Sequence, residues 1–221
     1  MTIRAVIFDF GGVIVPGSPS GDDPNSRWAR LEREHGLPKG SLFDAFYLKN
    51  PAWLQLRIGG SSDAEWRRES HAQITALADP AVAEAIVAAV WSDRAQGDGL
   101  RGEPTSNDGM VGLVQRLKGR VKVSILSNAA PGLEQELRQH YRIYDLFDDV
   151  INSATVRMAK PDPRIFGLAA GRLGLQPPDC FFTDDLAHNV EAARSTGMLA
   201  HQFDGYSGLA EALRAAGLDP S

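Results

Sequence analysis

Four short runs of this chain are apolar on both faces of an extended strand, and they limit the folds it can adopt more than any other feature. They are IRAVIFDF (3–10), VKVSILSN (121–128), CFFTDD (180–185) and MLAHQF (198–203). Such strands are typical of parallel sheets, because helices cover these sheets on both sides. Amphipathic helical patterns lie between the runs, and Gly174 follows one of them as a helix stop. The sequence therefore predicts an α/β fold with a doubly wound parallel sheet.

Residues 17–98 follow a different pattern, with helical periods throughout and no clear strand. Two turn-rich segments, GSPSGDDPNS (17–26) and QGDGLRGEP (96–104), flank this region and are typical of hinges. We therefore expect a Rossmann-like core domain formed by residues 1–16 and 99–221, with residues 17–98 inserted as a helical domain.

Composition excludes several classes of protein. The net charge of -5 and the lack of long basic runs argue against nucleic acid or an anionic membrane surface as partner. A single cysteine, Cys180, can form neither an intramolecular disulfide nor a thiolate metal site, which is typical of a reducing cytoplasm. No apolar run approaches the roughly 20 residues of a spanning helix, and the N-terminus lacks the layout of a signal peptide. We expect a cytoplasmic monomer or homodimer.

Acidic and polar residues stand at or beyond the carboxyl ends of the predicted strands. They are Asp9 after the first run, Ser127 and Asn128 after the second, Lys160 in the loop RMAKPDP, and Asp184 with Asp185 after the third. In open α/β sheets, ligands bind beyond the carboxyl ends of the strands, where loops and helix N-termini converge. We therefore expect these residues to share one site.

The chemistry of this set points to a metal and a phosphoryl group. Three carboxylates in a small volume would raise the pKa of at least one of them unless a cation lies among them. Ligation by oxygen alone, without histidine or cysteine, indicates Mg²⁺. Lys160 can supply a positive charge and Ser127 a hydroxyl donor to a phosphoryl group. Asp9 can then act as the nucleophile.

These residues also resemble a known family. The order Asp9-Phe10-Gly11-Gly12-Val13, Ser127-Asn128, Lys160-Pro161 and Asp184-Asp185 is similar to motifs one to four of the haloacid dehalogenase superfamily, in its subgroup with a helical cap inserted after motif one. The resemblance spans the chain from Asp9 to about Phe203. It implies a Rossmann-like core, a mobile cap, Mg²⁺ and an aspartyl-enzyme intermediate at Asp9. The metal ligands that it implies are Asp9, the backbone carbonyl of Gly11 and Asp185, with Asp184 in a secondary role.

The chain departs from this family pattern at Gly11. Phosphatases of the family usually carry a second aspartate there, which protonates the leaving group and later activates water, whereas typical dehalogenases carry an aromatic residue. Glycine can offer its carbonyl to a metal but has no proton to donate, and losing positioned acid–base help costs about 10²–10⁴-fold in rate. His188, just beyond Asp185, is one candidate for the missing acid, although the same pattern is typical of a surface histidine at a helix start.

We therefore predict a Mg²⁺-dependent phosphatase of a small phosphorylated metabolite. Asp9, Ser127 and Lys160 are the predicted catalytic residues, and Ser127, Asn128 and Lys160 are predicted to bind the substrate. Arg57, close to the glycine pair at 59 and 60, is a further candidate for substrate binding, and packing within the helical insert is the alternative role.

Two other functions stay open. In a 2-haloacid dehalogenase, Asp9 would attack carbon and no metal would be required. A non-catalytic phosphoacceptor or binding module would keep the metal pocket without turnover, and the glycine at position 11 is the feature that supports this alternative. Metal dependence separates the phosphatase from the dehalogenase, and the paired acids at 184 and 185 favour the phosphatase.

Overall fold

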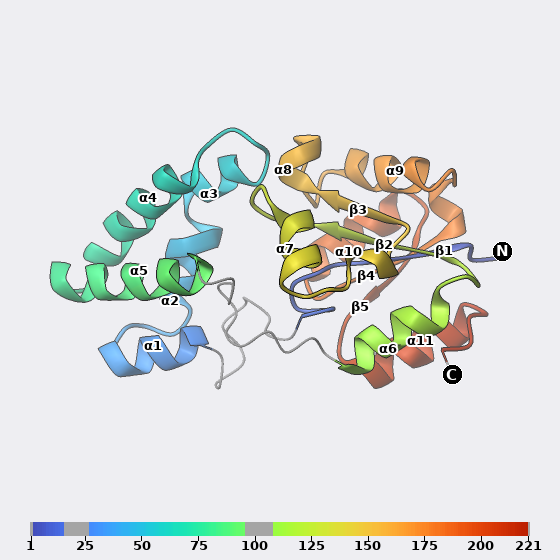
Figure 1. Ribbon diagram of the computed structural model, residues 1–221, viewed down its shortest axis with the longest axis horizontal. Coiled ribbons are helices and arrows are strands. Elements are labelled where there is room, and N and C mark those ends of the chain that lie inside the picture. The colour runs from blue at the N-terminus through green and yellow to red at the C-terminus, as the bar shows by residue number, and fades with distance from the viewer. Residues whose placement is uncertain (1, 16–26, 96–107, 221) are drawn as a thin grey trace. The chain divides into compact units, whose positions relative to one another are not determined.

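The computed structural model describes residues 2–15, 27–95 and 108–220 of the chain. The chain divides into two compact units, which are Met1–Pro16 with Thr105–Ser221 and Gly17–Pro104 (Figure 1). The two predicted hinges, and the predicted domain boundary between residues 98 and 99, lie outside the described residues.

The first unit contains a sheet of five parallel strands in the order β3-β2-β1-β4-β5. The strands are Ala5–Phe8 (β1), Lys122–Ser127 (β2), Asp149–Asn152 (β3), Cys180–Asp184 (β4) and Leu199–Gln202 (β5). In the register of the sheet, Phe8 stands opposite Ile125 on one side and Thr183 on the other. This order confirms the predicted α/β fold and makes β1 the middle strand.

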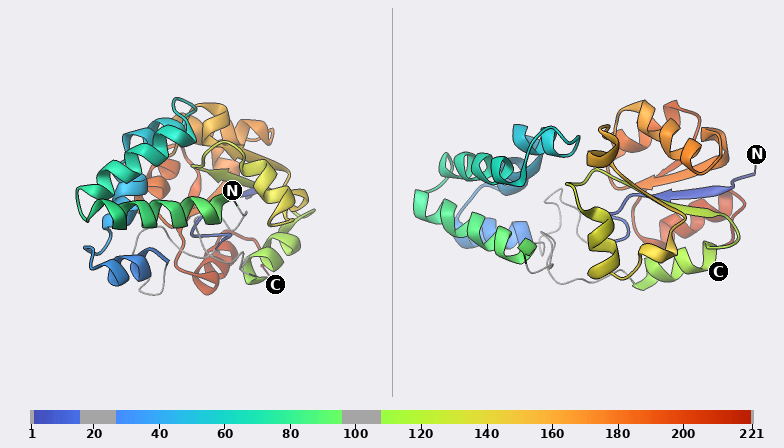
Figure 2. Two further views of the ribbon diagram at one scale, coloured as in Figure 1. Left: turned by 60° about the vertical axis from the view of Figure 1, so that its left-hand side comes forward. Right: turned by 45° about the horizontal axis from the view of Figure 1, so that its top comes forward.

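Helices cover both faces of the sheet (Figures 1 and 2). They are α6 (Asp108–Leu117), α7 (Leu133–Gln139), α8 (Ser153–Val156), α9 (Pro163–Arg172), α10 (Ala187–Ser195) and α11 (Tyr206–Ala215), with 3-10 turns η3 (Tyr144–Leu146) and η4 (Pro177–Asp179). Alternate residues of β1 enter two separate cores: Val6 and Phe8 pack with residues of α6, α7 and α11, whereas Ala5 and Ile7 pack with residues of α9 and α10. This two-sided burial explains why the run is apolar throughout.

Two strands differ from the sequence-based expectation. β3 was not predicted, because only Val150 and Ile151 separate the polar residues at its two ends, and so short an apolar pair does not distinguish a strand from a loop. β5 was expected to be covered on both faces, yet it is an edge strand and Leu199 is 43% exposed. In addition, Asp185 lies one residue beyond β4 rather than within the strand.

The second unit is helical over its described residues. Its elements are α1 (Arg27–His35), α2 (Ser41–Phe43), the π-helix η1 (Asp44–Leu48), α3 (Pro51–Leu56), α4 (Asp63–Thr75) and α5 (Pro80–Ala95). Its core is aromatic: the fully buried Trp66 lies 4.7 Å from Trp53 and 5.1 Å from Trp91 between ring centroids, and its indole N–H donates to the carbonyl of Phe46 at 2.6 Å. Across both units, none of the described helices is both long enough and apolar enough to cross a bilayer.

Candidate active site

Asp9 stands at the centre of the carboxyl edge of the sheet, because it directly follows the middle strand. Its backbone N–H donates to the carbonyl of Thr183 at 2.9 Å, which extends the pairing of β1 with β4 by one residue. Its Oδ1 accepts from the backbone N–H of Phe10 at 2.7 Å, and the residue is only 7% exposed. The sheet therefore holds this carboxylate in a fixed and largely dry position.

Lys160 lies beside Asp9, although in the sequence it belongs to a distant loop. Its Nζ is 2.8 Å from Asp9 Oδ1 and 2.6 Å from Asp184 Oδ2, and the residue is buried. Burial by itself lowers the pKa of a lysine, but the adjacent carboxylates of Asp184 and Asp9 raise the pKa of Lys160 above its ordinary value. The side chain is therefore a cation that bridges two of the three predicted site acids.

Asn128 fixes the backbone on which Lys160 is carried. Its Nδ2 donates to the carbonyl of Lys160 at 2.9 Å, and its Oδ1 accepts from the N–H of Lys160 at 2.9 Å. The preceding residue, Ser127, is buried at the end of β2, where it stands opposite Asn152 of β3. Both polar groups of the Asn128 side chain are thus used to position Lys160, and its expected contact with the substrate stays a prediction.

Asp184 is fully buried and is engaged by protein donors at both carboxylate oxygens. Its Oδ1 accepts from the N–H of Leu186 at 2.9 Å and from Asn189 Nδ2 at 3.0 Å. Its Oδ2 accepts from Lys160 Nζ at 2.6 Å and from Asn189 Nδ2 at 3.1 Å. These contacts make Asp184 the anchor of Lys160 and occupy both of its carboxylate oxygens.

Asp185 packs directly over the second glycine of the first motif. Gly12 has φ 87°, and a Cβ built on it would lie 2.6 Å from Asp185 Oδ2 and 2.7 Å from Asp185 Cγ. Two independent requirements, a left-handed backbone and the space for a carboxylate, therefore select glycine at this position. The backbone carbonyl of Asp185 also accepts from Gln202 Nε2 at 3.1 Å, which ties this loop to the end of β5.

The three acids form a cluster of oxygen ligands. Asp9, Asp184 and Asp185 each offer a carboxylate oxygen, and these oxygens lie within 4.8 Å of one another. Burial is the largest influence on Asp9; although Lys160 acts to lower its pKa, burial together with Asp184 and Asp185 raises the pKa of Asp9 to about 7. A cation among these oxygens would favour the ionised form of Asp9, so the donor set fits a hard, oxygen-liganded ion such as Mg²⁺.

Gly11 leaves no side chain two residues after Asp9. It is buried and forms a bridge with Val15, and the N–H of Gly12 donates to the carbonyl of Val15 at 2.9 Å, so the chain turns tightly after β1. His188, the candidate for a replacement acid, is exposed on the first turn of α10, whereas Asp9 is buried. The geometry of the described residues thus gives no support to His188 as the missing acid.

Arg57 belongs to the helical unit, where it follows α3 as the C-cap residue. Its side chain is half-buried, and its Nε is inaccessible to solvent with no hydrogen-bond acceptor among the described residues. This burial lowers the pKa of the guanidinium below its ordinary value. Trp53, one turn earlier, instead belongs to the aromatic core, with its ring 5.0 Å from that of Tyr47.

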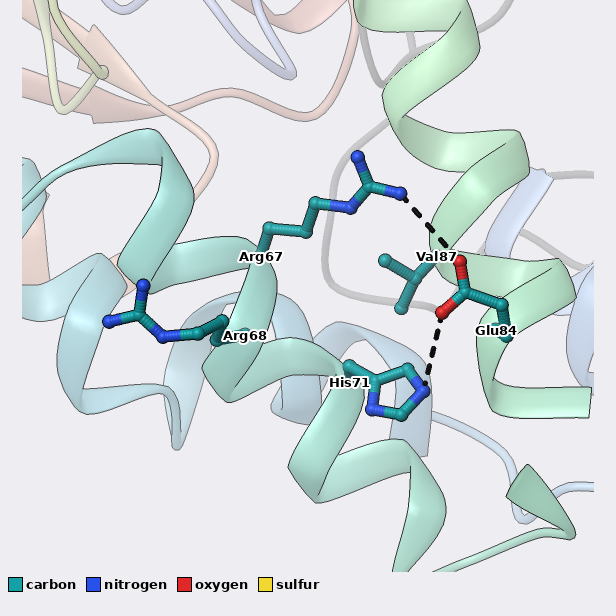
Figure 3. Close-up of a pocket in the computed structure, with 5 residues that line it drawn as sticks. All are labelled: Arg67, Arg68, His71, Glu84 and Val87. Atoms are coloured by element: carbon teal, nitrogen blue, oxygen red, sulfur yellow. Dashed lines mark ion pairs between the residues drawn. The ribbon is translucent and has the colours of Figure 1, made fainter. Parts of the chain in front are cut away.

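A surface pocket of about 360 Å³ also lies within the helical unit, between α4 and α5 (Figure 3). It is lined by Arg67, Arg68, His71, Glu84 and Val87. Arg67 and His71 both point to the carboxylate of Glu84, at 3.8 and 3.5 Å (Figure 3). None of these residues belongs to the predicted site.

Two residues that position the site could be found in the sequence only with difficulty. In the sequence, Asn189 fits equally a residue that orients the loop after β4 and an ordinary helix position, because its bonds to Asp184 depend on how α10 packs. Ser153 was not singled out, yet its Oγ accepts from the N–H of Ala129 at 3.1 Å and so connects α8 to the loop after Ser127. The one local signal was Asn152, whose side chain caps α8 by accepting from the N–H of Ala154.

Comparison with known proteins agrees with this geometry. The model of the family described as "Hydrolase: haloacid dehalogenase-like hydrolase" matches residues 3–197. Acyl-CoA dehydrogenase family member 10 of Mus musculus is 28% identical over 205 residues, which cover 91% of this chain and 18% of that protein. Phosphatase MT3486 of Mycobacterium tuberculosis is 39% identical over 85 residues, 38% of this chain and 39% of that protein.

A third relative, fructose-1-phosphate phosphatase YqaB of Escherichia coli, is 30% identical over 89 residues, which cover 40% of this chain and 47% of that protein. The chain therefore spans less than half the length of these curated relatives. The matches to the two phosphatases are local, whereas the family model covers most of the chain.

Solved structures show the same fold at low sequence identity. A HAD family enzyme of Bacteroides thetaiotaomicron, in complex with magnesium and inorganic phosphate, aligns with a TM-score of 0.60 at 23% identity over 90% of this chain and 93% of that one. The L-2-haloacid dehalogenase of Xanthobacter autotrophicus, with chloropropionic acid covalently bound, aligns with a TM-score of 0.62 at 21% identity over 97% and 83%. With the family model matching residues 3–197, we conclude that this chain belongs to the haloacid dehalogenase-like hydrolases.

Proposed function

We propose that this hydrolase is a Mg²⁺-dependent phosphatase that acts on a small phosphorylated metabolite. The observation that carries the proposal is the buried carboxylate of Asp9, which touches the Lys160 ammonium and shares a cluster of oxygen ligands with two further acids. Among the described residues, both contacts of the Asp9 carboxylate are made by Oδ1. Its Oδ2 therefore remains available to attack phosphorus.

The reaction would proceed in two displacements at phosphorus. In the first, an Asp9 oxygen forms a bond to phosphorus, and the bond to the leaving oxygen breaks. In the second, water attacks the phosphorus of the aspartyl phosphate, which releases inorganic phosphate and the free carboxylate. Lys160 would stabilise the charge that develops on the phosphoryl oxygens, and Ser127 would donate its hydroxyl to them.

Mg²⁺ would be held by Asp9, Asp185 and the carbonyl of Gly11, with Asp184 contributing only through its contact with Lys160. When bound, the ion would neutralise negative charge on the phosphoryl group and favour ionised carboxylates around it. The contacts of Asp184 with three protein donors support this division between the paired acids.

Asp185→Asn should weaken Mg²⁺ binding by at least about tenfold, because it removes one charged oxygen from the ligand set. Calorimetric titration of Mg²⁺ into the wild type and the variant, with a phosphate analogue present, measures the effect. Asp145→Asn is the matched control, because it removes the same charge at a position away from the cluster. The Asp145 side chain is 97% exposed. Failure of the wild type to bind Mg²⁺ would remove the metal from the proposal.

The glycine at position 11 should restrict the enzyme to good leaving groups. Without a carboxylic acid there, departure of the leaving group must rely on electrostatic stabilisation, which serves groups that leave without a proton. We expect acyl phosphates, anomeric sugar phosphates and activated aryl phosphates to be hydrolysed faster than simple alkyl phosphates, by about 10²–10⁴-fold. A leaving-group series with kcat/KM for each member measures this difference.

Gly11→Asp should reduce the difference in kcat/KM between good and poor leaving groups, because the aspartate supplies the missing acid. Gly12, and not Gly11, adopts the left-handed conformation, so an aspartate at position 11 needs no unusual backbone. Equal rates across the leaving groups in the wild type would show that another group already acts as the acid. Mg²⁺ binding without turnover of any member would instead favour a non-catalytic phosphoacceptor.

The dehalogenase alternative has one observation in its favour, which is the likeness of fold to the L-2-haloacid dehalogenase. In that case Asp9 would attack carbon and displace a halide, and the reaction would need no metal. Assays of 2-haloacids and phosphomonoesters with and without Mg²⁺ separate the two activities. The clustered acids favour the phosphatase, because a halide displacement gives no role to a divalent cation.

We further propose that the helical unit acts as the cap, which selects the substrate, with Arg57 as one of its binding residues. Support comes from the half-buried side chain of Arg57, which has no ion pair and no acceptor for its Nε among the described residues, so packing within the unit gives its charge no partner. The aromatic core of the unit gives it a packed interior of its own, as an inserted domain requires.

A further inference from the structure

Arg157 adopts a backbone conformation that normally selects glycine. Its φ is 55° and its ψ is 32°, in the left-handed region that a Cβ disfavours. The residue ends α8, where its N–H donates to the carbonyl of Ser153. Helices commonly end on glycine in this conformation, so a long cationic side chain at this position needs another explanation.

The position of Arg157 in the fold explains why a cationic side chain stands there. Helix α8 begins directly after β3, at the carboxyl edge of the sheet (Figure 1). Arg157, which ends α8, therefore lies at this edge, three residues before Lys160. The hydroxyl of Ser153 connects α8 to Ala129, next to the asparagine that holds the Lys160 backbone. Arg157 therefore belongs to the same set of loops as the candidate active site.

The charges at this edge favour an additional cation. Among the described residues, the cluster holds three carboxylates and the ammonium of Lys160, which is already shared between Asp9 and Asp184. With the proposed Mg²⁺ bound, the charges of these groups sum to about zero, so a phosphomonoester dianion would gain from a further cation at this edge. Arg157 is exposed, and its side chain forms no hydrogen bond or ion pair with any described residue, so its guanidinium can bind an anion without breaking a contact.

We infer that Arg157 is a substrate-binding residue, whose guanidinium attracts and holds the phosphate-bearing ligand at the carboxyl edge of the sheet. The inference rests on the proposed phosphatase function and adds to it a residue of this chain that determines affinity for anions. A purely structural role is the alternative, because a cation at a helix C-terminus is also favoured by the helix dipole.

The chain offers a closely matched control for the experiment. Arg142 is also exposed and also has a left-handed backbone, with φ 56°. It precedes η3 and the start of β3, however, and so lies toward the amino ends of the parallel strands. Arg157→Gly and Arg142→Gly each remove one positive charge and one unfavourable left-handed residue, but only the first removes charge from the carboxyl edge.

We expect Arg157→Gly to raise the KM for acetyl phosphate about tenfold with little change in kcat, because a charge-assisted hydrogen bond to the substrate is lost. It should weaken the binding of inorganic phosphate, measured by calorimetry with Mg²⁺, to a similar degree. Arg142→Gly should leave both quantities at their wild-type values. Arg157→Asn, which removes the charge but tolerates the left-handed backbone, should reproduce the effect and covers the case in which the glycine variant folds poorly.

Equal KM and equal phosphate affinity in the wild type and both Arg157 variants would overturn the inference. The same holds if Arg142→Gly weakens binding as much as Arg157→Gly, since the effect would then be one of net charge. A wild type that hydrolyses no phosphomonoester would contradict the proposed function instead. In that case the calorimetric comparison of phosphate binding still decides whether Arg157 binds the anion.

Discussion

Lys160→Met should lower the free energy of unfolding by about 3–5 kcal/mol, because it leaves two buried carboxylates without their shared cation. Nζ of Lys160 contacts Asp9 and Asp184 at 2.8 and 2.6 Å, and the residue is 1% exposed. Turnover should fall by at least about 10²–10³-fold, since the same ammonium would stabilise the phosphoryl charge. Urea denaturation and steady-state kinetics measure the two effects on one preparation.

Lys122→Met provides the matched control for the effect on stability. Lys122 also pairs with an aspartate, Asp148, at 3.1 Å, but its side chain is 57% exposed. Loss of an exposed pair costs about 0–1 kcal/mol. A Lys160 variant no less stable than the Lys122 variant would show that Asp9 and Asp184 do not depend on the buried cation.

Asp9→Asn should lower kcat by about 10⁶-fold, because it removes the proposed nucleophile, while the protein remains folded. An asparagine can still accept the N–H of Phe10 through its side-chain oxygen, and Lys160 keeps its contact with Asp184. The measurement pairs kcat with circular dichroism. Transfer of labelled phosphate from an acyl phosphate to the wild type, and not to the variant, identifies the acceptor.

Asp184→Asn gives a useful contrast, because it removes the anchor of Lys160 rather than the attacking oxygen. We expect this change to reduce both stability and rate, whereas Asp9→Asn reduces the rate alone. Turnover by Asp9→Asn within tenfold of the wild type would contradict a nucleophilic role for Asp9 in either hydrolase mechanism.

The sequence predicted a parallel sheet covered on both faces and the residues at its carboxyl edge, because both follow from short-range patterns and one topological rule. A strand apolar on both faces indicates helices on both sides, and polar residues such as Asp9 and Ser127 at the ends of parallel strands meet at one edge. The structure places Asp9, Lys160 and Asp184 in direct contact there.

What the sequence did not predict depends on long-range packing. The burial of Lys160 requires Asp184 on one side and the backbone contact of Asn128 on the other, and no local pattern reports either. The different surroundings of Asp184 and Asp185 depend on where Asn189 lies once α10 has packed. β3 was missed for the opposite reason, because its four residues are too few for a period to be recognised.

The contact between Gly12 and Asp185 has an evolutionary consequence. A side chain can enter at position 12 only if the carboxylate at position 185 moves away or becomes shorter, because their atoms would otherwise overlap. The two positions are far apart in the chain, yet this contact predicts that substitutions at one of them depend on the residue at the other. In a lineage of such proteins, a glycine after the first strand would persist for as long as the acid after the fourth strand is needed. The glycine at position 12 is thus required by the position of a carboxylate far along the chain, and it does not indicate flexibility.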